Sequence, residues 1–192
     1  MIRIALIGDI GSGKSHFAKL FGFPVFNADD EVAKLYKKSR KCYIKLKKNL
    51  PNYINSFPIN KKHLVKAIID RNSNFKKIIK IVHPEIRFKM KKFIRKNKNK
   101  KIILLDVPLL LESKLNEKND ILIFIETKKA EVIKRLKKRP GFNLKVLNKF
   151  RKLQLPLEVK KRKSNFIIKN NFINNFAKKN VKILLNKILL ND

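Results

Sequence analysis

Eight residues near the start of the chain could bind a phosphate. The stretch Gly8–Ser15 reads GDIGSGKS and fits the pattern G-x-x-x-x-G-K-[ST] of a P-loop. Glycines let consecutive backbone N–H groups point into one concave nest, which suits a polyphosphate. Lys14 can reach the β- and γ-phosphates as a mobile positive charge, and the Ser15 hydroxyl can coordinate a bridging Mg²⁺. The spacing therefore predicts a nucleoside triphosphate site.

The sequence on either side of this loop supports the same interpretation. Residues 2–7 form an apolar run short enough for a buried strand, and residues 16–21 carry apolar side chains at helical spacing. A strand, a glycine-rich loop and a helix together are the context that this motif requires. A glycine-rich turn without function is the alternative, and it accounts for these flanks less well.

A short apolar run at residues 24–26 predicts a second strand, and Asp29 follows it closely. Ligands of parallel sheets gather at the carboxyl ends of the strands, so an acidic residue there could meet a substrate hydroxyl. The alternative is structural: Asp29 or Asp30 caps the helix that continues through residues 32–36. One of the two carboxylates can cap the helix while the other faces a cleft.

Residues 101–106 predict a buried strand that ends in a carboxylate, Asp106. An apolar strand that ends in an acid is the Walker B pattern, in which the acid lies near the Mg²⁺. Pro108 prevents the strand from continuing. Asp106 is therefore a second candidate for the metal or for the acceptor.

The stretch between the second and third predicted strands is rich in lysine, and its apolar residues recur at helical spacing. His83 precedes a proline, which predicts a helix break or a helix start at that point, and Arg87 lies on the same helical face as His83. The expected helices cover residues 37–50, about 60–69 and 75–81, with a loop at 51–58.

The last third of the chain predicts two more strands separated by cationic helices. The turn that contains Arg139 is rich in glycine and proline and suits a lid that closes over a nucleotide; an ordinary exposed helix end is the alternative. The expected elements are a strand at 121–126, helices at 129–138 and 144–155, a strand at 165–168 and a final amphipathic helix.

Length and composition favour one globular domain with a small subdomain. The chain has 192 residues, of which 44% are hydrophobic, enough for one sizeable core. No apolar run reaches the roughly 18 residues that a membrane span requires. Cys42 is the single cysteine, so an intramolecular disulfide is excluded, and a reducing cytoplasm is the expected location.

The formal charge of +35 arises from 49 Lys and Arg residues against 14 Asp and Glu residues. Such an excess is typical of nucleic-acid-binding proteins. Here lysine is spread along the whole chain, so we favour a solvated surface over a nucleic-acid site. We expect binding to polyanions at low salt to be unspecific and to weaken as salt rises. We expect no obligate protein partner.

The order of these motifs resembles that of the dephospho-coenzyme A kinase family, over nearly the whole chain. The resemblance rests on the P-loop, Asn27–Asp29, His83–Pro84, Leu105–Glu112, Arg135, Arg139 and Gln154–Lys160. Three positions depart from the family pattern. The family usually has aspartate at the position of Asn27, and it commonly has glycine at the position of Asp9 and threonine at the position of His16.

The resemblance implies a P-loop kinase: an α/β fold with a five-stranded parallel sheet and helices on both faces. It also implies a helical acceptor-binding subdomain at about residues 30–95 and a lid at about residues 139–160. The implied reaction moves the γ-phosphate of ATP to the ribose 3′-hydroxyl of dephospho-coenzyme A, with Mg²⁺, and yields coenzyme A and ADP. The alternatives are another P-loop nucleoside or nucleotide kinase and a basic nucleic-acid-binding protein.

The resemblance also implies roles for individual residues. Asp29 is the candidate base for the 3′-hydroxyl, and Arg139, with Arg135 as second choice, would neutralise the triphosphate. The phosphate ligands are Gly11, Ser12, Gly13, Lys14, Ser15 and His16; the metal ligands are Ser15 and Asp106; the acceptor contacts are Asp29, His83, Arg87 and Asp106.

Overall fold

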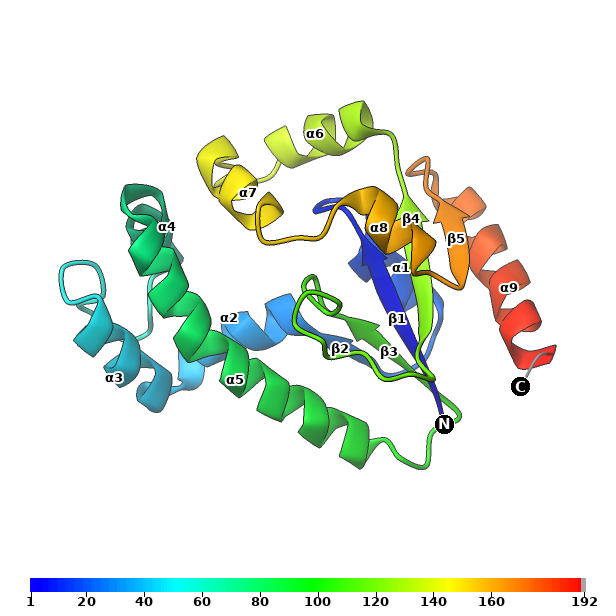
Figure 1. Cartoon of the computed structure of the whole chain (residues 1–192), viewed down its shortest axis with the longest axis horizontal. Coiled ribbons are helices and arrows are strands. Elements are labelled where there is room, and N and C mark those ends of the chain that lie inside the picture. Colours follow the sequence, from blue (N-terminus) through cyan, green and yellow to red (C-terminus); the bar gives the residue numbers. More distant parts are fainter. Residues whose placement is uncertain (191–192) are drawn as a thin grey trace. The chain divides into compact units, whose positions relative to one another are not determined.

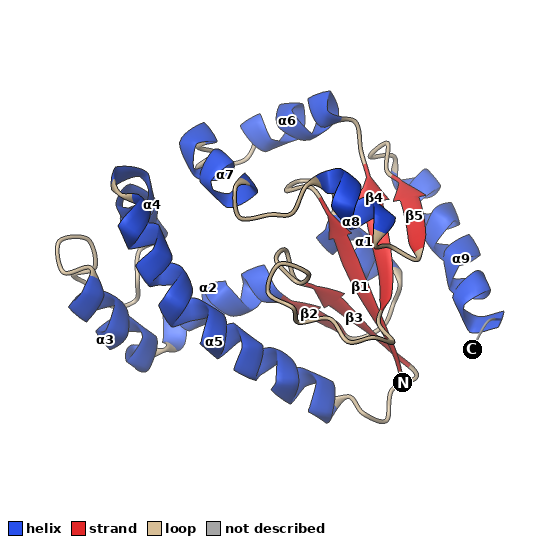
Figure 2. Cartoon of the chain, in the orientation of Figure 1, coloured by secondary structure: helices blue, strands red, loops and turns tan. Residues whose placement is uncertain are grey.

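The computed structural model describes residues 1–190, which contain one five-stranded sheet. The strand order is β2-β3-β1-β4-β5, and every neighbouring pair is parallel (Figure 2). The strands are β1 (Ile2–Gly8), β2 (Val25–Asn27), β3 (Ile102–Asp106), β4 (Ile121–Glu126) and β5 (Phe166–Lys169). The predicted parallel α/β sheet is confirmed.

Helices and loops connect the strands (Figure 1). None of the helices within residues 1–190 is both long and apolar enough to cross a bilayer. They are α1 (Lys14–Leu20), α2 (Ala28–Lys38), α3 (Arg40–Asn49), α4 (Lys61–Asp70), α5 (Asn72–Lys96), α6 (Lys129–Lys137), α7 (Leu144–Arg151), α8 (Leu157–Arg162) and α9 (Asn174–Leu190).

The chain divides into two compact units. Of the described residues, the sheet unit contains 1–27, 97–143 and 150–190. The helical unit contains residues 28–96 and 144–149.

The core of the sheet unit lies between one face of the sheet and two helices. Ile4 and Leu6 of β1 are fully buried there, against Phe17 of α1 and Leu184 of α9. The alternate residues of the same strands, such as Ile103, are also fully buried, and α8 packs against β1 from the other face (Figure 1). Because both faces are covered, the strands read as continuous apolar runs.

The helical unit is organised around α5. Its residues Ile78, Val82, Ile86 and Met90 recur every fourth position and are all buried, which gives the apolar stripe that α2, α3 and α4 contact. Glu31 of α2 accepts a bond of 2.9 Å from the Lys89 ammonium of α5.

The expected helix break at His83–Pro84 is wrong, because α5 continues through both residues. A proline inside a helix removes one backbone hydrogen bond and costs about 3 kcal/mol. The buried stripe has members on both sides of Pro84, and this packing outweighs the local cost.

Two helix boundaries also differ from expectation. Helix α2 begins at Ala28, so Asp29 and Asp30 lie inside its first turn and do not cap it. Helix α7 ends at Arg151 and not at residue 155. The Leu155 N–H donates to the Glu112 carboxylate at 2.9 Å, so it is not available for a helical hydrogen bond. The next residue, Pro156, also favours an extended conformation at Leu155.

A buried ion pair holds α8 to the turn that follows β3. The Lys160 ammonium lies 2.8 Å from Glu112 Oε1 and donates to the Gln154 side-chain oxygen at 3.1 Å. Lys160 is only 1% exposed. Removing one partner of such a pair leaves a buried charge without compensation, which is strongly destabilising.

We therefore expect Lys160→Met to lower the free energy of unfolding by about 3–5 kcal/mol. In a domain of this size the change corresponds to a fall in Tm of roughly 6–20 °C. Thermal unfolding followed by circular dichroism measures it.

Lys161→Met is the matched control, because the Lys161 pair with Glu126 is more than 30% exposed on both sides. We expect it to change Tm far less than Lys160→Met does, because water screens an exposed pair. The double variant Lys160→Met/Glu112→Gln should recover much of the loss. Equal Tm values for Lys160→Met and Lys161→Met would contradict this account of the buried pair.

Candidate active site

The P-loop occupies the turn between β1 and α1, and its shape requires glycine. Gly11 and Gly13 have φ angles of 85° and 95°, a region that residues with a side chain rarely adopt. A Cβ at Gly11 would lie 2.9 Å from Leu136 Cγ, and one at Gly13 would lie 2.6 Å from Asn170 Nδ2. The loop is therefore closely surrounded, and both its backbone angles and its surroundings require glycine at these two positions.

Hydrogen bonds hold the loop in place. The Ser12 N–H donates to the Asp9 carbonyl at 3.2 Å, and the Asn170 amide donates to the Ser12 carbonyl at 2.8 Å. The His16 N–H donates to the Gly13 carbonyl at 3.0 Å. His16 would have to give up that bond to contact a phosphate through its backbone.

Lys14 lies over the loop. Its side chain is largely buried, and its ammonium donates to the Asp9 carbonyl at 2.7 Å and to the Gly8 carbonyl at 3.4 Å. These two hydrogen bonds to backbone carbonyls hold the positive charge of Lys14 at the loop. A phosphate in the nest would meet a charge that is already in position.

The Ser15 hydroxyl and the Asp106 carboxylate meet at the carboxyl edge of the sheet. Ser15 Oγ donates to Asp106 Oδ2 at 2.5 Å. The Asn27 amide donates to the same Asp106 oxygen at 2.7 Å and to Ser15 Oγ at 3.3 Å. Asn27 and Asp106 are paired residues at the ends of β2 and β3, so the sheet register brings them together.

The replacement of aspartate by Asn27 has a physical consequence here. An amide donates a hydrogen bond to Asp106, whereas a carboxylate in the same place would repel it. The Asn27 amide thus stabilises the Asp106 carboxylate beside Ser15.

These oxygens suit Mg²⁺, a hard cation that prefers carboxylate and hydroxyl oxygens and keeps several waters. Residues 1–190 contain no group of three or more His, Cys, Asp or Glu side chains that could hold a metal. A small set of protein oxygens completed by phosphate and water is how P-loop enzymes hold Mg²⁺. Ser15 and Asp106 therefore fit the metal-binding role predicted for them.

Three predicted acceptor contacts belong to the helical unit. Asp29 is exposed in the first turn of α2, and Arg87 is exposed on α5. His83 is half-buried on α5, and burial, together with the Arg87 charge, lowers the pKa of its imidazole. A lowered pKa keeps His83 neutral near pH 7, when it can both donate and accept a hydrogen bond.

The two predicted arginines differ in their surroundings. Arg139 lies in an exposed turn after α6, and among the described residues its guanidinium makes no ion pair. The Arg135 guanidinium lies 4.3 Å from the centre of the Phe172 ring, a cation–π contact. Phe172 also lies near Gly13, since a Cβ on that glycine would be 3.8 Å from its ring. Arg135 is thus held beside the P-loop.

The structure adds two residues that the sequence reasoning did not single out. Asn170 supports the P-loop through Ser12, and Arg151 forms an ion pair with Asp9. Asn170 directly follows the last strand, so the rule about carboxyl ends of strands could have identified it. Arg151 has no such signal, because 142 residues separate it from Asp9.

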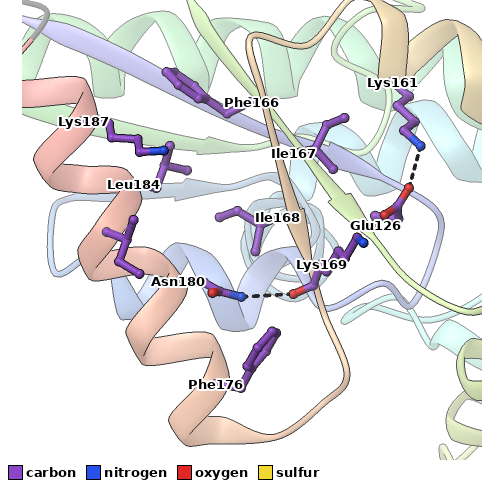
Figure 3. A pocket seen from close by; sticks show the side chains of 11 residues that line it. Glu126, Lys161, Phe166, Ile167, Ile168, Lys169, Phe176, Asn180, Leu184 and Lys187 are labelled. Atoms are coloured by element: carbon purple, nitrogen blue, oxygen red, sulfur yellow. Dashed lines mark hydrogen bonds and ion pairs between the residues drawn. The ribbon is translucent and has the colours of Figure 1, made fainter.

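A groove between β5 and α9 is a separate feature of the sheet unit (Figure 3). Its volume is about 760 Å³, and Phe166, Ile167, Phe176 and Leu184 supply apolar walls. The Asn180 amide crosses one end of it to the Lys169 carbonyl at 3.3 Å. No P-loop residue lines this groove, so it is not the phosphate site.

Comparison with known proteins identifies the family. The family model described as dephospho-CoA kinase matches residues 2–175. The chain belongs to the dephospho-CoA kinase family. Its resemblance to that family in motif order is thereby confirmed.

Relatives agree with this assignment, and solved structures share the fold. The dephospho-CoA kinase of Wolbachia from Brugia malayi is 36% identical, over 86% of this chain and 87% of its own. The dephospho-CoA kinase of Wolbachia pipientis wMel is 32% identical, over 98% of this chain and 98% of its own. A dephospho-CoA kinase structure from Campylobacter jejuni has a TM-score of 0.66 at 23% identity and covers 97% of this chain and 96% of its own. The shikimate kinase of Acinetobacter baumannii shares the fold, with a TM-score of 0.56 at 15% identity, over 100% of this chain and 95% of its own.

Loss of Lys14 should remove phosphoryl transfer but leave the fold intact. We expect Lys14→Ala to lower turnover by about 100-fold to 1,000-fold, the usual effect of removing one preorganised contact to transition-state charge. Lys19→Ala is the matched control, because Lys19 is an exposed lysine on the same helix. Coupled detection of ADP measures turnover, and thermal unfolding checks the fold. Equal turnover in the two variants would refute the P-loop assignment.

Proposed function

We propose that the protein transfers the γ-phosphate of ATP to the ribose 3′-hydroxyl of dephospho-coenzyme A and releases coenzyme A and ADP. One observation carries the proposal: a P-loop with Lys14 in place lies beside the Ser15–Asp106 pair in a chain of the dephospho-CoA kinase family. Phosphoryl transfer requires alignment of the reactants and neutralisation of charge more than covalent chemistry by the protein.

The P-loop supports the binding of the triphosphate. In our proposal the backbone of Gly11, Ser12 and Gly13 surrounds the β- and γ-phosphates, and Lys14 stabilises the charge that develops on the transferred group. The closely surrounded glycines keep these donors in one arrangement, so little reorganisation is needed when the phosphate moves.

Ser15 and Asp106 would hold Mg²⁺, and Asn27 would keep the Asp106 carboxylate oriented. When bound, the metal supplies positive charge to the phosphate oxygens. The hydrogen bond of 2.5 Å between Ser15 and Asp106 supports this role, because it keeps the two oxygens close together.

Asp29 is the proposed base for the 3′-hydroxyl proton, with Asp106 as the alternative. Asp29 comes two residues after Asn27, whose amide contacts Asp106, and this short connection supports the role. His83 and Arg87 are proposed to contact the acceptor, and Arg139 or Arg135 to neutralise the triphosphate.

Further proposals concern two segments of the chain, the cellular location and the binding partners. We propose that the helical stretch at about 30–95 binds the acceptor and that the segment at about 139–160 closes over the nucleotide. We also propose that the enzyme acts in the cytoplasm, without an obligate protein partner. Its binding to polyanions would be unspecific and lost at higher salt.

The direct test is incubation of the protein with ATP, Mg²⁺ and dephospho-coenzyme A, followed by mass analysis. We expect the acceptor to gain one phosphate, at the 3′-hydroxyl, and ADP to form in equal amount. Parallel reactions with nucleosides and nucleoside monophosphates test a different kinase specificity. Phosphorylation of one of those acceptors in place of dephospho-coenzyme A would overturn the proposal.

Asp29→Asn separates a catalytic role from a structural one. If Asp29 takes the proton, the amide should lower turnover by about 100-fold to 10,000-fold, because an amide does not act as a base near neutral pH. If its charge only complements the first turn of α2, the substitution should cost about 1 kcal/mol or less of stability and leave turnover unchanged. Turnover and Tm are measured on the same preparation.

Asp30→Asn is the matched control, since Asp30 is the neighbouring exposed carboxylate in the same turn. Successive residues of a helix point in different directions, so the two side chains are not interchangeable. We expect Asp30→Asn to retain turnover. Normal turnover in Asp29→Asn would rule out the catalytic role and make Asp106 the next candidate.

A further inference from the structure

Asp9 places a carboxylate inside the phosphate-binding loop. It is the residue after Gly8, and its side chain is only 11% exposed. Its Oδ1 accepts a bond of 2.7 Å from the Ile10 N–H, which fixes the carboxylate against the loop. A fixed negative charge within a few ångströms of a bound polyphosphate repels it, and partial burial weakens the screening by water.

Lys14 contacts Asp9 through the backbone. Its ammonium donates to the backbone carbonyl of Asp9 at 2.7 Å. The cation that pairs with the Asp9 carboxylate comes from another part of the chain.

Arg151 supplies that cation from the end of α7. Its Nη2 lies 2.7 Å from Asp9 Oδ2, and its Nε donates to Oδ1 at 3.4 Å. The Arg151 side chain is 25% exposed, so the pair is partly shielded from water. A guanidinium that contacts both carboxylate oxygens matches the charge in position as well as in sign.

We propose that Arg151 is a positioning residue of the ATP site, which masks the Asp9 charge so that the P-loop can accept a polyphosphate. The effect is electrostatic and does not require Arg151 to contact the nucleotide. The inference rests on the proposed binding of ATP, but not on the identity of the acceptor.

The proposal makes a distinctive prediction about pairs of substitutions. Arg151→Gln keeps a polar side chain with N–H donors but shortens it and removes the charge, so Asp9 is unmasked. Asp9→Asn retains the acceptor for the Ile10 N–H but removes the charge that needs masking. If masking is the role of Arg151, the second substitution should rescue the first.

The experiment is calorimetric titration of the whole protein with MgATP in the absence of acceptor. We expect Arg151→Gln to weaken binding by about 10-fold to 100-fold, the scale of one unscreened charge near the phosphates. The double variant should return to within about 3-fold of the wild type. Asp9→Asn alone should bind MgATP a few-fold more tightly, because the Arg151 charge is then unopposed.

Arg162→Gln is the matched control, since it removes an exposed arginine from α8 in the same unit. We expect it to leave MgATP affinity unchanged. The Tm of each variant without nucleotide, and the affinity of Arg151→Gln at higher salt, are measured alongside. Masking predicts that the loss shrinks as salt rises, which a purely structural role would not produce.

Three results would overturn the proposal. Wild-type affinity in Arg151→Gln would show that the Asp9 charge needs no masking. Equally weak binding in the single and double variants would mean that Arg151 acts on the nucleotide directly. A fall in Tm without any change in affinity would make the pair a structural tie. Failure of the wild type to phosphorylate dephospho-coenzyme A would leave these binding measurements interpretable.

Discussion

The parallel register of the sheet is the constraint on which the site depends. Pairing of β1 with β3 places the P-loop and Asp106 at the same edge, and pairing of β2 with β3 sets Asn27 opposite Asp106. A shift of one residue in either register would turn these side chains to the other face. The side chains of β1 and β3 are packed on both faces, and close packing resists such a shift, so the core protects the geometry of the site.

Charge placement is the second theme, because acidic groups are scarce in a chain with a formal charge of +35. Three carboxylates in the sheet unit each have a specific neighbour: Asp106 has Ser15 and Asn27, Asp9 has Arg151, and Glu112 has Lys160. Each neighbour donates to a carboxylate that is largely shielded from water. An exposed lysine at the surface can be replaced by another without loss of a specific contact, whereas each of these donors has one partner.

The sequence alone predicted the strands, the P-loop and the carboxylate at the end of β3. These features are local: an apolar run, a glycine spacing and an acid at a strand end each have a direct physical meaning. Their order also predicted the dephospho-CoA kinase family, which the comparisons confirmed. The prediction was wrong at Pro84, where burial of the α5 stripe overrides a local preference, and at the end of α7, where Glu112 accepts the Leu155 N–H.

Only the tertiary structure decided which distant residues meet. The partners of Asp9, Glu112 and Ser12 lie 142, 48 and 158 residues further along the chain. No periodicity or motif encodes such contacts, because they depend on how whole strands and helices are stacked. The sequence by itself determined the chemistry of the P-loop, because glycine, lysine and serine at that spacing are typical of a phosphate-binding site. The fold determined how that chemistry is supported, because a buried charge is stable only where folding has brought its partner to it.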